Sequence, residues 1–325
     1  MPRAPIQIDR VLDDPDRIRE LVLANAPYWP VYRYFSDSVE LAASGAPVRD
    51  LGAPMQVPLW FRGDWADTRP LVPGVEPILH SARFARGARE LYDLSDDAVI
   101  RPQLVYVNLM LPMPAADRGH TDVPAFRGIR RDRFPVWLLS VMGHSGLFGR
   151  WQIRIATAVS WWYDGVGGQF TCWPDGPDAA PVVIPAGSNK AIIGENESMF
   201  HRVERVGAKQ AELHLDGLTS GAELTADAGT WQVREQGRTL ARVSFEDIRI
   251  SVSWKAEVFS DPDEAHMADA HLDDLAIGQV WRMLASDLHG RGVDVDPGQA
   301  PLTNARLITA LGKAYARTPS HFPEL

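Results

Sequence analysis

The feature that most constrains this chain is a succession of short β-prone segments between about residues 100 and 258. Each segment is rich in β-branched and aromatic residues, and Gly, Pro or Asp separates it from the next. Many short strands punctuated in this way are typical of an antiparallel sandwich, jelly roll or barrel. The sequence therefore predicts a mainly β protein. The segments are LVYVNLMLPM, IRIATAVSWWY, GQFTCWP, PVVIPAG, KAIIGEN, SMFHRVERV, WQVRE, LARVSF and RISVSWKAEVF.

Helical patterns flank this β region on both sides. Apolar residues recur at helical spacing over residues 14–26, 77–94, 263–290 and 305–317. The Pro- and Trp-rich stretches PYWPVYRYF and VPLWFRGDW, which lie between the first two patterns, are expected to be irregular. REQGRT, centred on Gly237, is expected to be a hairpin turn.

The chain has no internal repeat, low-complexity segment or linker, so one domain over residues 1–325 is expected. We expect an N-terminal helical and irregular part over 1–99, a β core over 100–258 and C-terminal helices over 259–325. With 325 residues and 45% hydrophobic content, such a chain can bury a sizeable core.

Composition excludes several classes of partner and site. A net charge of -9 argues against nucleic acid, because neutralising phosphates requires a basic surface. The single cysteine, Cys172, cannot form an intramolecular disulfide or build a thiolate metal cage. No stretch approaches the roughly 20 apolar residues of a membrane span, and the N-terminus lacks the apolar core of a signal peptide. We therefore expect a cytoplasmic protein without a membrane partner; nothing indicates its oligomeric state.

A histidine and an aspartate end one of the most apolar stretches of the chain, in RGHTDVP at residues 118–124. Side chains at i and i+2 of a strand point to the same face, so His120 and Asp122 can converge on one metal ion. A polar turn that closes a buried strand is the alternative. His271 and Asp273 have the same spacing, but on a helix they would lie about 200° apart. His214 and Asp216, in AELHLDGLTSG, remain a competing pair.

The third ligand of a metal site is expected to be His201, in the β-prone run MFHRVERV. Two histidines and one carboxylate form the facial triad that holds non-haem Fe(II) and leaves coordination positions open. His80 and His144 have less support, since one lies in a helical pattern and the other in the Gly-flanked turn MGHSG. A hydrogen-bonded structural histidine is the alternative role for His201.

One face of the segment RISVSWK, residues 249–255, is entirely polar. Arg249, Ser251, Ser253 and Lys255 share that face if the segment is a strand. A half-exposed strand would show the same pattern. Inside a barrel, however, the fork of an arginine and a nearby hydroxyl would bind a carboxylate.

Taken in order, HTD, GGQFTCWPDGP, MFHRVERVG and RISVSW resemble the Fe(II)/2-oxoglutarate-dependent dioxygenases over roughly residues 100–258. The resemblance implies a double-stranded β-helix core of the jelly-roll or cupin kind. It implies that His120, Asp122 and His201 bind iron, and that Arg249 and Ser251 bind the distal carboxylate of 2-oxoglutarate. Lys255 is the rival cation for that carboxylate. Arg249 follows His201 by 249 minus 201, or 48 positions, which is more than the family pattern, so an insertion at about 208–247 is expected.

The activity that the resemblance implies is hydroxylation or desaturation of a small-molecule substrate by O2, with release of succinate and CO2. Because Asp122 is present, these outcomes are favoured over halogenation. Two alternatives stay open: a β-barrel metalloenzyme that uses the triad without 2-oxoglutarate, and a non-catalytic jelly-roll binding protein.

Substrate identity does not follow from the sequence. Four arginines of FRGIRRDRF follow the triad motif and could meet an anionic substrate, or form a solvated loop: Arg127, Arg130, Arg131 and Arg133. Five tryptophans could line an apolar pocket, or simply pack in the core: Trp137, Trp151, Trp161, Trp162 and Trp173. DGVGG, residues 164–168, could be a flexible turn near the mouth of a site or only a hairpin loop.

Overall fold

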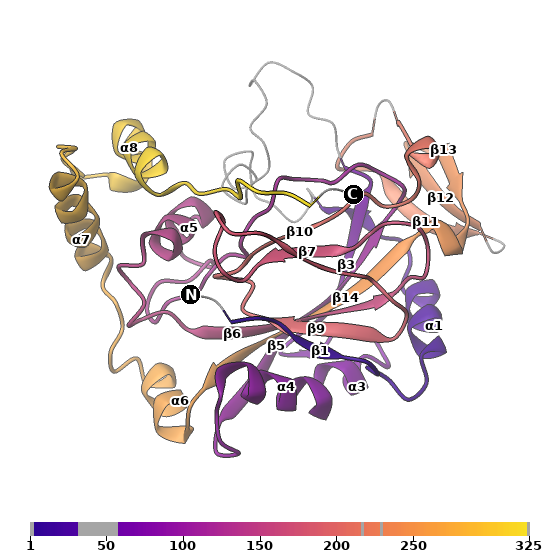
Figure 1. Ribbon diagram of the computed structural model, residues 1–325, viewed down its shortest axis with the longest axis horizontal. Coiled ribbons are helices and arrows are strands. Elements are labelled where there is room, and N and C mark those ends of the chain that lie inside the picture. The colour runs from indigo at the N-terminus through magenta and orange to yellow at the C-terminus, as the bar shows by residue number, and fades with distance from the viewer. Residues whose placement is uncertain (1–2, 32–57, 216–217, 228–229, 324–325) are drawn as a thin grey trace.

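The computed structural model describes residues 3–31, 58–215, 218–227 and 230–323, and its largest element is an eight-stranded antiparallel sheet (Figure 1). The strand order is β1-β9-β6-β14-β5-β3-β2, and β4 pairs with β3. In chain order these strands are β1 (Ile6–Ile8), β2 (Trp29–Pro30), β3 (Trp60–Asp67), β4 (Arg69–Pro70), β5 (Val99–Met110), β6 (Arg154–Trp162), β9 (Lys190–Gly194) and β14 (Arg249–Phe259).

A second antiparallel sheet packs against the main one. It has the order β10-β7-β8, with bounds Phe200–Val203, Phe170–Trp173 and Val182–Ile184. Trp161 of β6 packs in one cluster with Phe170 and Cys172 of β7, which joins the two sheets. The segment that carries His120 extends the second sheet through a single bridge to His201.

The path of the chain between the two sheets defines the fold. After β5 the chain crosses to the His120 segment, returns for β6, and crosses again for β7 and β8. It then returns for β9, crosses for β10 and ends the core with β14 in the main sheet. This winding is a double-stranded β-helix, and the mainly β fold predicted from the sequence is confirmed.

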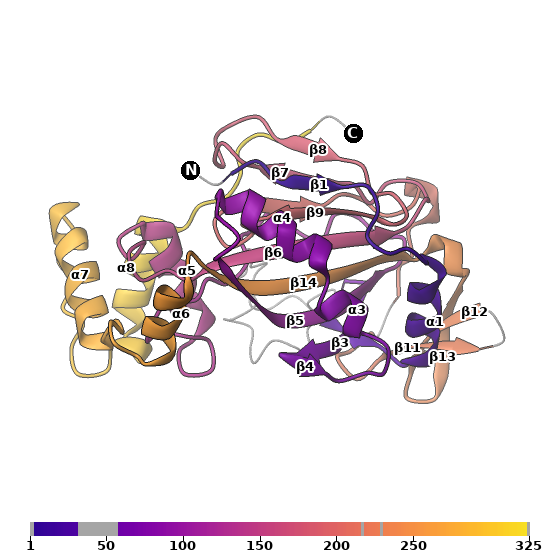
Figure 2. The ribbon, with the colours of Figure 1, turned by 90° about the horizontal axis from the view of Figure 1, so that it is seen from below.

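Strand β14 illustrates how residue pattern and position agree. Its apolar positions Ile250, Val252 and Trp254 lie in the core beneath α3 (Glu76–Leu79) and α4 (Ala82–Tyr92), which cover the outer face of the main sheet (Figure 2). The Trp254 indole donates a hydrogen bond to the Leu79 carbonyl at 2.9 Å. The polar positions of β14 therefore face the interior between the two sheets.

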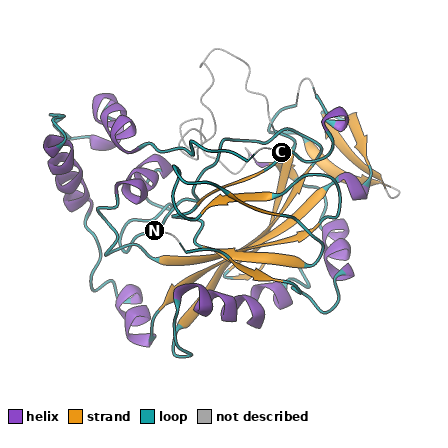
Figure 3. Ribbon diagram, viewed as in Figure 1, coloured by secondary structure: helices purple, strands orange, loops and turns teal. Residues whose placement is uncertain are grey.

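The remaining helices are α1 (Asp16–Ala24), α5 (Val136–Ser145), α6 (Pro262–Asp269), α7 (Ile277–Gly290) and α8 (Ala305–Tyr315). Helices α5, α7 and α8 gather at one end of the molecule around a separate apolar cluster that includes Leu138, Leu284 and Leu311 (Figure 3). Short 3-10 helices span Lys209–Ala211, Phe245–Asp247 and Pro301–Thr303. In the described parts of the chain no helix has the length and apolar character needed to cross a membrane.

A small three-stranded sheet lies in the segment 208–247, between β10 and β14. Its strands are β11 (Glu223–Asp227), β12 (Thr230–Glu235) and β13 (Arg238–Val243). The β12–β13 turn contains Gln236 and Gly237 with φ of 49° and 79°, as a two-residue hairpin turn requires. Leu224 of β11 exchanges backbone hydrogen bonds with Tyr28, which attaches this sheet to the N-terminal part.

Several expected elements differ in the structure. The stretch WFRGDWAD, expected to be irregular, is strand β3; a register shift between Asp64 and Ala66 interrupts the alternation that would have revealed it. Helix α5 was not expected, because its apolar residues surround the helix instead of forming one stripe. The pattern over 77–94 is two helices, separated where Ser81 caps α4, and the pattern over 263–290 is α6 and α7. Most of PYWPVYRYF lies outside the described residues.

Candidate metal centre

The structure brings His120, Asp122 and His201 together. We call residues 118–122, which carry His120 and Asp122, the edge segment. His120 and His201 exchange backbone hydrogen bonds of 3.0 and 2.9 Å, so the edge segment and β10 hold their side chains side by side. The Asp122 amide donates to the Asn196 carbonyl at 2.8 Å. The candidate ligand atoms of the three side chains all lie within 4.8 Å of one another. Among the described residues this is the one such group of histidine, cysteine and carboxylate side chains.

The orientation of both imidazoles fits a metal ligand. His201 Nδ1 lies 3.0 Å from the Met199 carbonyl oxygen, which can only accept, so Nδ1 donates and Nε2 keeps a free lone pair. His201 Nε2 lies 3.8 Å from Asp122 Oδ1. His120 Nδ1 lies 2.8 Å from Asp117 Oδ2. A carbonyl or carboxylate on the second ring nitrogen is the usual support of a metal-binding histidine, so this donor set fits a divalent transition metal.

Burial and neighbouring charges separate the pKa values of the ligands. Burial and the adjacent His120 lower the pKa of His201 to about 4. Burial opposes the charged form of His120 as well, but the carboxylates of Asp117 and Asp122 outweigh it and raise the pKa of His120 to about 9. Burial would raise the pKa of Asp122, yet Lys255 and the two histidines hold it well below its usual range. Asp122 is therefore ionised and available as a ligand.

Lys255 and Glu197 complete the surroundings of Asp122. Lys255 Nζ donates to Asp122 Oδ2 at 2.7 Å and to Glu197 Oε1 at 2.6 Å. Burial disfavours the ammonium, but these two carboxylates outweigh it and raise the pKa of Lys255 above its usual range. Burial raises the pKa of Glu197 to about 7. Lys255, the rival cation for a cosubstrate, is thus already paired with two carboxylates.

Arg249 lies on the same face of β14 as Lys255, and no carboxylate among the described residues pairs with it. Its side chain is 0% exposed, and burial lowers its pKa to about 10. Nε donates to the Gly168 carbonyl at 2.7 Å, and Nη1 donates to Ser251 Oγ at 3.2 Å. Nη2 has no partner in the described chain. A buried guanidinium that is only partly hydrogen-bonded is costly, so its position favours an anionic ligand.

A cavity of about 800 Å³ opens beside the candidate ligands. His120, Asp122 and Lys255 line one side, and Trp60, Arg62, Tyr106 and Asn108 of β3 and β5 line another. The Trp60 indole donates to Asn108 Oδ1 at 2.9 Å, which leaves the Asn108 amide nitrogen free to donate elsewhere. The Arg62 guanidinium lies 3.8 Å from the centre of the Tyr106 ring.

Sequence reasoning missed this wall of the cavity because it assigned no strand to Trp60. Of the five tryptophans, for which lining a pocket and packing in the core were both open roles, none lines this cavity. Trp137 and Trp151 pack in the helical cluster, and Trp161 packs between the sheets. The arginine cluster is divided: Arg127 contacts Asp273 at 2.8 Å, whereas Arg130 and Arg131 line the cavity. Asp117 and Glu197 were also missed, because Asp117 lies three residues before His120 and Glu197 four before His201, and neither has the His-x-Asp spacing.

The competing histidines lie elsewhere. His214 is exposed in a loop, and Asp216 falls outside the described residues. His271 is exposed and contacts Asp274 at 2.9 Å. His144, in the last turn of α5 and not in a turn as expected, lies 3.1 Å from the Thr121 hydroxyl. His80 ends α3.

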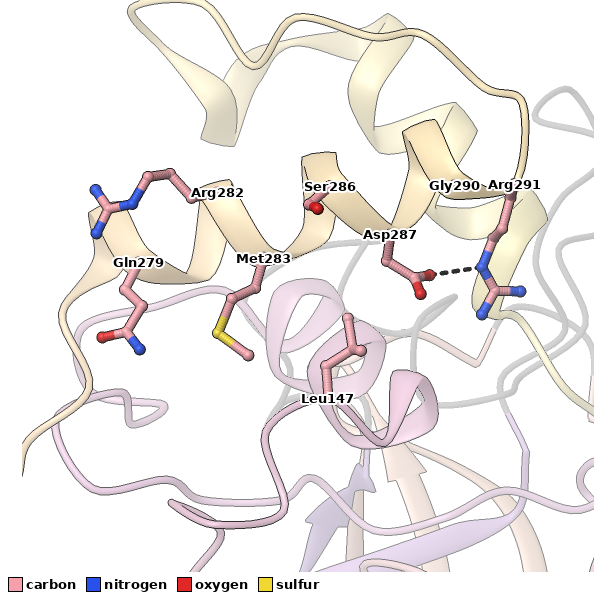
Figure 4. A pocket seen from close by; sticks show the side chains of 8 residues that line it. All are labelled: Leu147, Gln279, Arg282, Met283, Ser286, Asp287, Gly290 and Arg291. Atoms are coloured by element: carbon pink, nitrogen blue, oxygen red, sulfur yellow. Dashed lines mark hydrogen bonds and ion pairs between the residues drawn. The ribbon is translucent and has the colours of Figure 1, made fainter.

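A second, more open cavity of about 640 Å³ lies along α7 (Figure 4). Its ends are marked by Gln279 and by Arg291, which contacts Asp287 at 2.5 Å. None of the side chains that line it belongs to the candidate metal centre, and Asp287 is its one potential metal ligand. It offers no alternative site for a metal ion.

No family model and no curated protein matches the sequence. Solved structures with a similar fold include a 2OG-Fe(II) oxygenase-family oxidoreductase from Burkholderia pseudomallei, at 15% identity and TM-score 0.34, covering 76% of this chain and 93% of that chain. A prolyl-4-hydroxylase from Pseudomonas putida matches at 11% identity and TM-score 0.34, covering 78% and 92%. HygX from Streptomyces hygroscopicus, with nickel, 2-oxoglutarate and hygromycin B bound, matches at 11% identity and TM-score 0.35, covering 78% and 83%. At such low similarity, the assignment of function rests on the residues of the site.

Proposed function

We propose that the protein is an Fe(II)- and 2-oxoglutarate-dependent oxygenase that hydroxylates or desaturates a small-molecule substrate. The observation that carries the proposal is the donor group of His120, Asp122 and His201, whose ligand atoms lie within 4.8 Å of one another. The second ring nitrogen of each histidine is already engaged, by Asp117 or by the Met199 carbonyl. Two imidazoles and one carboxylate are the donors of non-haem Fe(II) oxygenases.

Bound iron would supply the activation of O2, coupled to decarboxylation of 2-oxoglutarate to succinate and CO2, that oxidises an unactivated C–H bond. The chain would supply positioning. Lys255 holds Oδ2 of Asp122, so the carboxylate presents Oδ1 toward His201. His201 is buried and His120 and Asp122 are partly buried, which limits the access of water and strengthens their interaction with a cation.

The cosubstrate proposal rests on Arg249. Its buried guanidinium pairs with no carboxylate in the described part of the chain, and the partner that would compensate it best is a bidentate anion. Ser251 lies on the same strand face and already accepts from Arg249 Nη1, so its hydroxyl hydrogen is free to bond the same anion. The distal carboxylate of 2-oxoglutarate meets both requirements.

The substrate would bind in the cavity beside the ligands. A volume of about 800 Å³ falls in the range of small-molecule sites. Leu104, Val123 and Pro124 give the cavity apolar walls, while the fixed amide of Asn108 offers a donor to a carbonyl or carboxylate oxygen. This combination favours a ligand with an apolar body and at least one acceptor group.

The decisive experiment is anaerobic titration of the Fe(II)-loaded protein with 2-oxoglutarate, followed by measurement of succinate after O2 is admitted. A weak visible charge-transfer band and slow succinate formation are expected even without the substrate. Iron binding without 2-oxoglutarate binding would favour a metalloenzyme that uses the triad alone. Absence of both would favour a non-catalytic binding protein.

A further inference from the structure

The segment after α8, residues 317–323, returns across the second sheet instead of ending beside the helices (Figure 1). We name it the C-terminal strap. The Ser320 amide donates to the Pro177 carbonyl, and the Trp173 indole donates to the His321 carbonyl, both at 2.9 Å. These bonds attach the strap to β7 and to the loop that follows it.

Phe322 of the strap contacts two arginines that neighbour the candidate ligands in sequence. The Arg118 guanidinium is 5.2 Å from the centre of its ring, and that of Arg202 is 4.8 Å away. Arg118 precedes His120 by two residues, and Arg202 directly follows His201. The same ring packs edge-on against Trp173 at 5.9 Å. One side chain therefore contacts both ligand-bearing segments and β7 beneath them.

A second strap residue fits closely against the edge segment. Pro319 is buried, and a Cβ added to Gly119 would lie 2.9 Å from Pro319 Cγ. Gly119 has φ of +107°, a conformation that other residues rarely adopt. The residue immediately before His120 thus has both the backbone freedom and the small size that contact with the strap requires.

The edge segment needs such support, because its backbone attachment to β10 is short. In the described chain one bridge, between His120 and His201, joins it to β10. The Arg202 side chain, by contrast, is fixed through two bonds of 2.7 and 2.8 Å to Glu204. Phe322 connects this fixed arginine to Arg118 of the edge segment.

We propose that the C-terminal strap positions His120 relative to His201, with Phe322 as its key positioning residue. The proposal rests on the metal centre of the proposed function but not on 2-oxoglutarate. If strap docking favours the ligand geometry, then by thermodynamic reciprocity metal binding favours strap docking. The effect of the strap on metal affinity and the effect of the metal on strap docking can each be measured.

The first test is the affinity for Ni(II), measured by calorimetry in the absence of 2-oxoglutarate and well below the unfolding temperature. Phe322→Leu keeps an apolar side chain but removes the ring, and we expect Ni(II) to bind about three- to tenfold more weakly. Phe322→Tyr, which restores the ring, should recover most of the affinity. Phe245→Leu is the matched control, because Phe245 stacks under Arg19 at 4.1 Å in another part of the fold. Wild-type affinity in Phe322→Leu would overturn the proposal.

The second test uses the unmodified chain, so it does not depend on any variant folding. Ni(II) should slow hydrogen exchange of the Ser320 amide, which bonds Pro177, by a larger factor than it slows exchange of the Gln232 amide of the small sheet. Equal exchange of Ser320 with and without Ni(II) would contradict the coupling. Neither measurement involves turnover. Loss of succinate formation would contradict the oxygenase proposal, whereas loss of the coupling between Ni(II) and Phe322 or Ser320 would contradict the strap proposal.

Discussion

At the scale of single residues, the proposed metal centre depends on the imidazole nitrogens of His120 and His201. We expect His120→Ala and His201→Ala to abolish Ni(II) binding and succinate formation while the protein remains folded. Each change removes a ligand, but His120 is only partly buried and His201 is one side chain of a large interior. Calorimetry measures Ni(II) binding, and circular dichroism tests whether each variant is folded. His214→Ala is the control and should bind Ni(II) normally. If His214→Ala loses Ni(II) binding and His120→Ala keeps it, the metal site has been assigned to the wrong His-x-Asp pair.

Proton competition at His120 makes metal affinity depend on pH. The pKa of His120 in the metal-free protein is raised to about 9, so below pH 9 a metal ion must displace its proton. Apparent affinity should therefore rise about tenfold per pH unit between pH 6 and 8, with release of about one proton. His201, with a pKa lowered to about 4, contributes nothing in this window.

Calorimetry in buffers of different ionisation enthalpy measures that proton. In Asp117→Asn the carboxylate that raises the pKa of His120 is lost, so the release at pH 7 should shrink. A pH-independent affinity in the wild type would rule out a protonated His120.

Arg249 and Lys255 carry distinguishable roles. Arg249→Ala should weaken 2-oxoglutarate binding by about 2–5 kcal/mol, or roughly 30-fold to several thousand-fold, while Ni(II) affinity stays close to wild type. Arg249→Lys should restore only part of the loss, because an ammonium lacks the bidentate fork. Titration of the Ni(II)-loaded protein gives both constants. The roles are reversed if Lys255→Met weakens 2-oxoglutarate binding without changing Ni(II) affinity and Arg249→Ala has no effect.

At the scale of elements, the loop between β6 and β7 contacts the Arg249 side chain and limits its position. Gly168 has φ of +69°, and an added Cβ would lie 2.7 Å from Arg249 Cδ. Gly168→Ala should displace the guanidinium and weaken 2-oxoglutarate binding about tenfold or more. Gly176→Ala is the control for backbone strain alone. Gly176 has φ of +97°, but an added Cβ there would have nothing within 4 Å. If both variants bind 2-oxoglutarate equally well, the loop does not position Arg249.

The elements that sequence could predict are those in which one periodicity is uninterrupted. In β14 the polar residues Arg249 and Lys255 fall on one face and Trp254 on the other. Both the strand and the face that it turns to the interior could therefore be predicted from the sequence. Strand β3 could not be predicted, because its register shift at Asp64 breaks the alternation. Strand spacing allowed His120 and Asp122 to converge on one ion, but it left a polar turn and the pair of His214 and Asp216 as alternatives. The contact of Asp122 with Lys255 could not be predicted, since it depends on how two sheets face each other.

At the scale of the whole molecule, the candidate ligands join segments that are far apart in sequence. His120 and Asp122 come from the edge segment, His201 from β10, and Lys255 supports Asp122 from the last core strand. An ion bound there would cross-link the segment that carries His120 and Asp122 to β10 of the second sheet. Because such a site does not exist in the unfolded chain, metal affinity adds directly to the free energy of unfolding.

Ni(II) should therefore raise the unfolding temperature, and a chelator should reverse the rise. At a free concentration about 100 times Kd, binding adds about 2.7 kcal/mol to the free energy of unfolding, which corresponds to an increase of a few degrees. Thermal denaturation monitored by circular dichroism measures it. His201→Ala should lose the metal-dependent increase, whereas His214→Ala should keep it. An equal increase in all three proteins would mean that the stabilising ion binds outside the group of His120, Asp122 and His201.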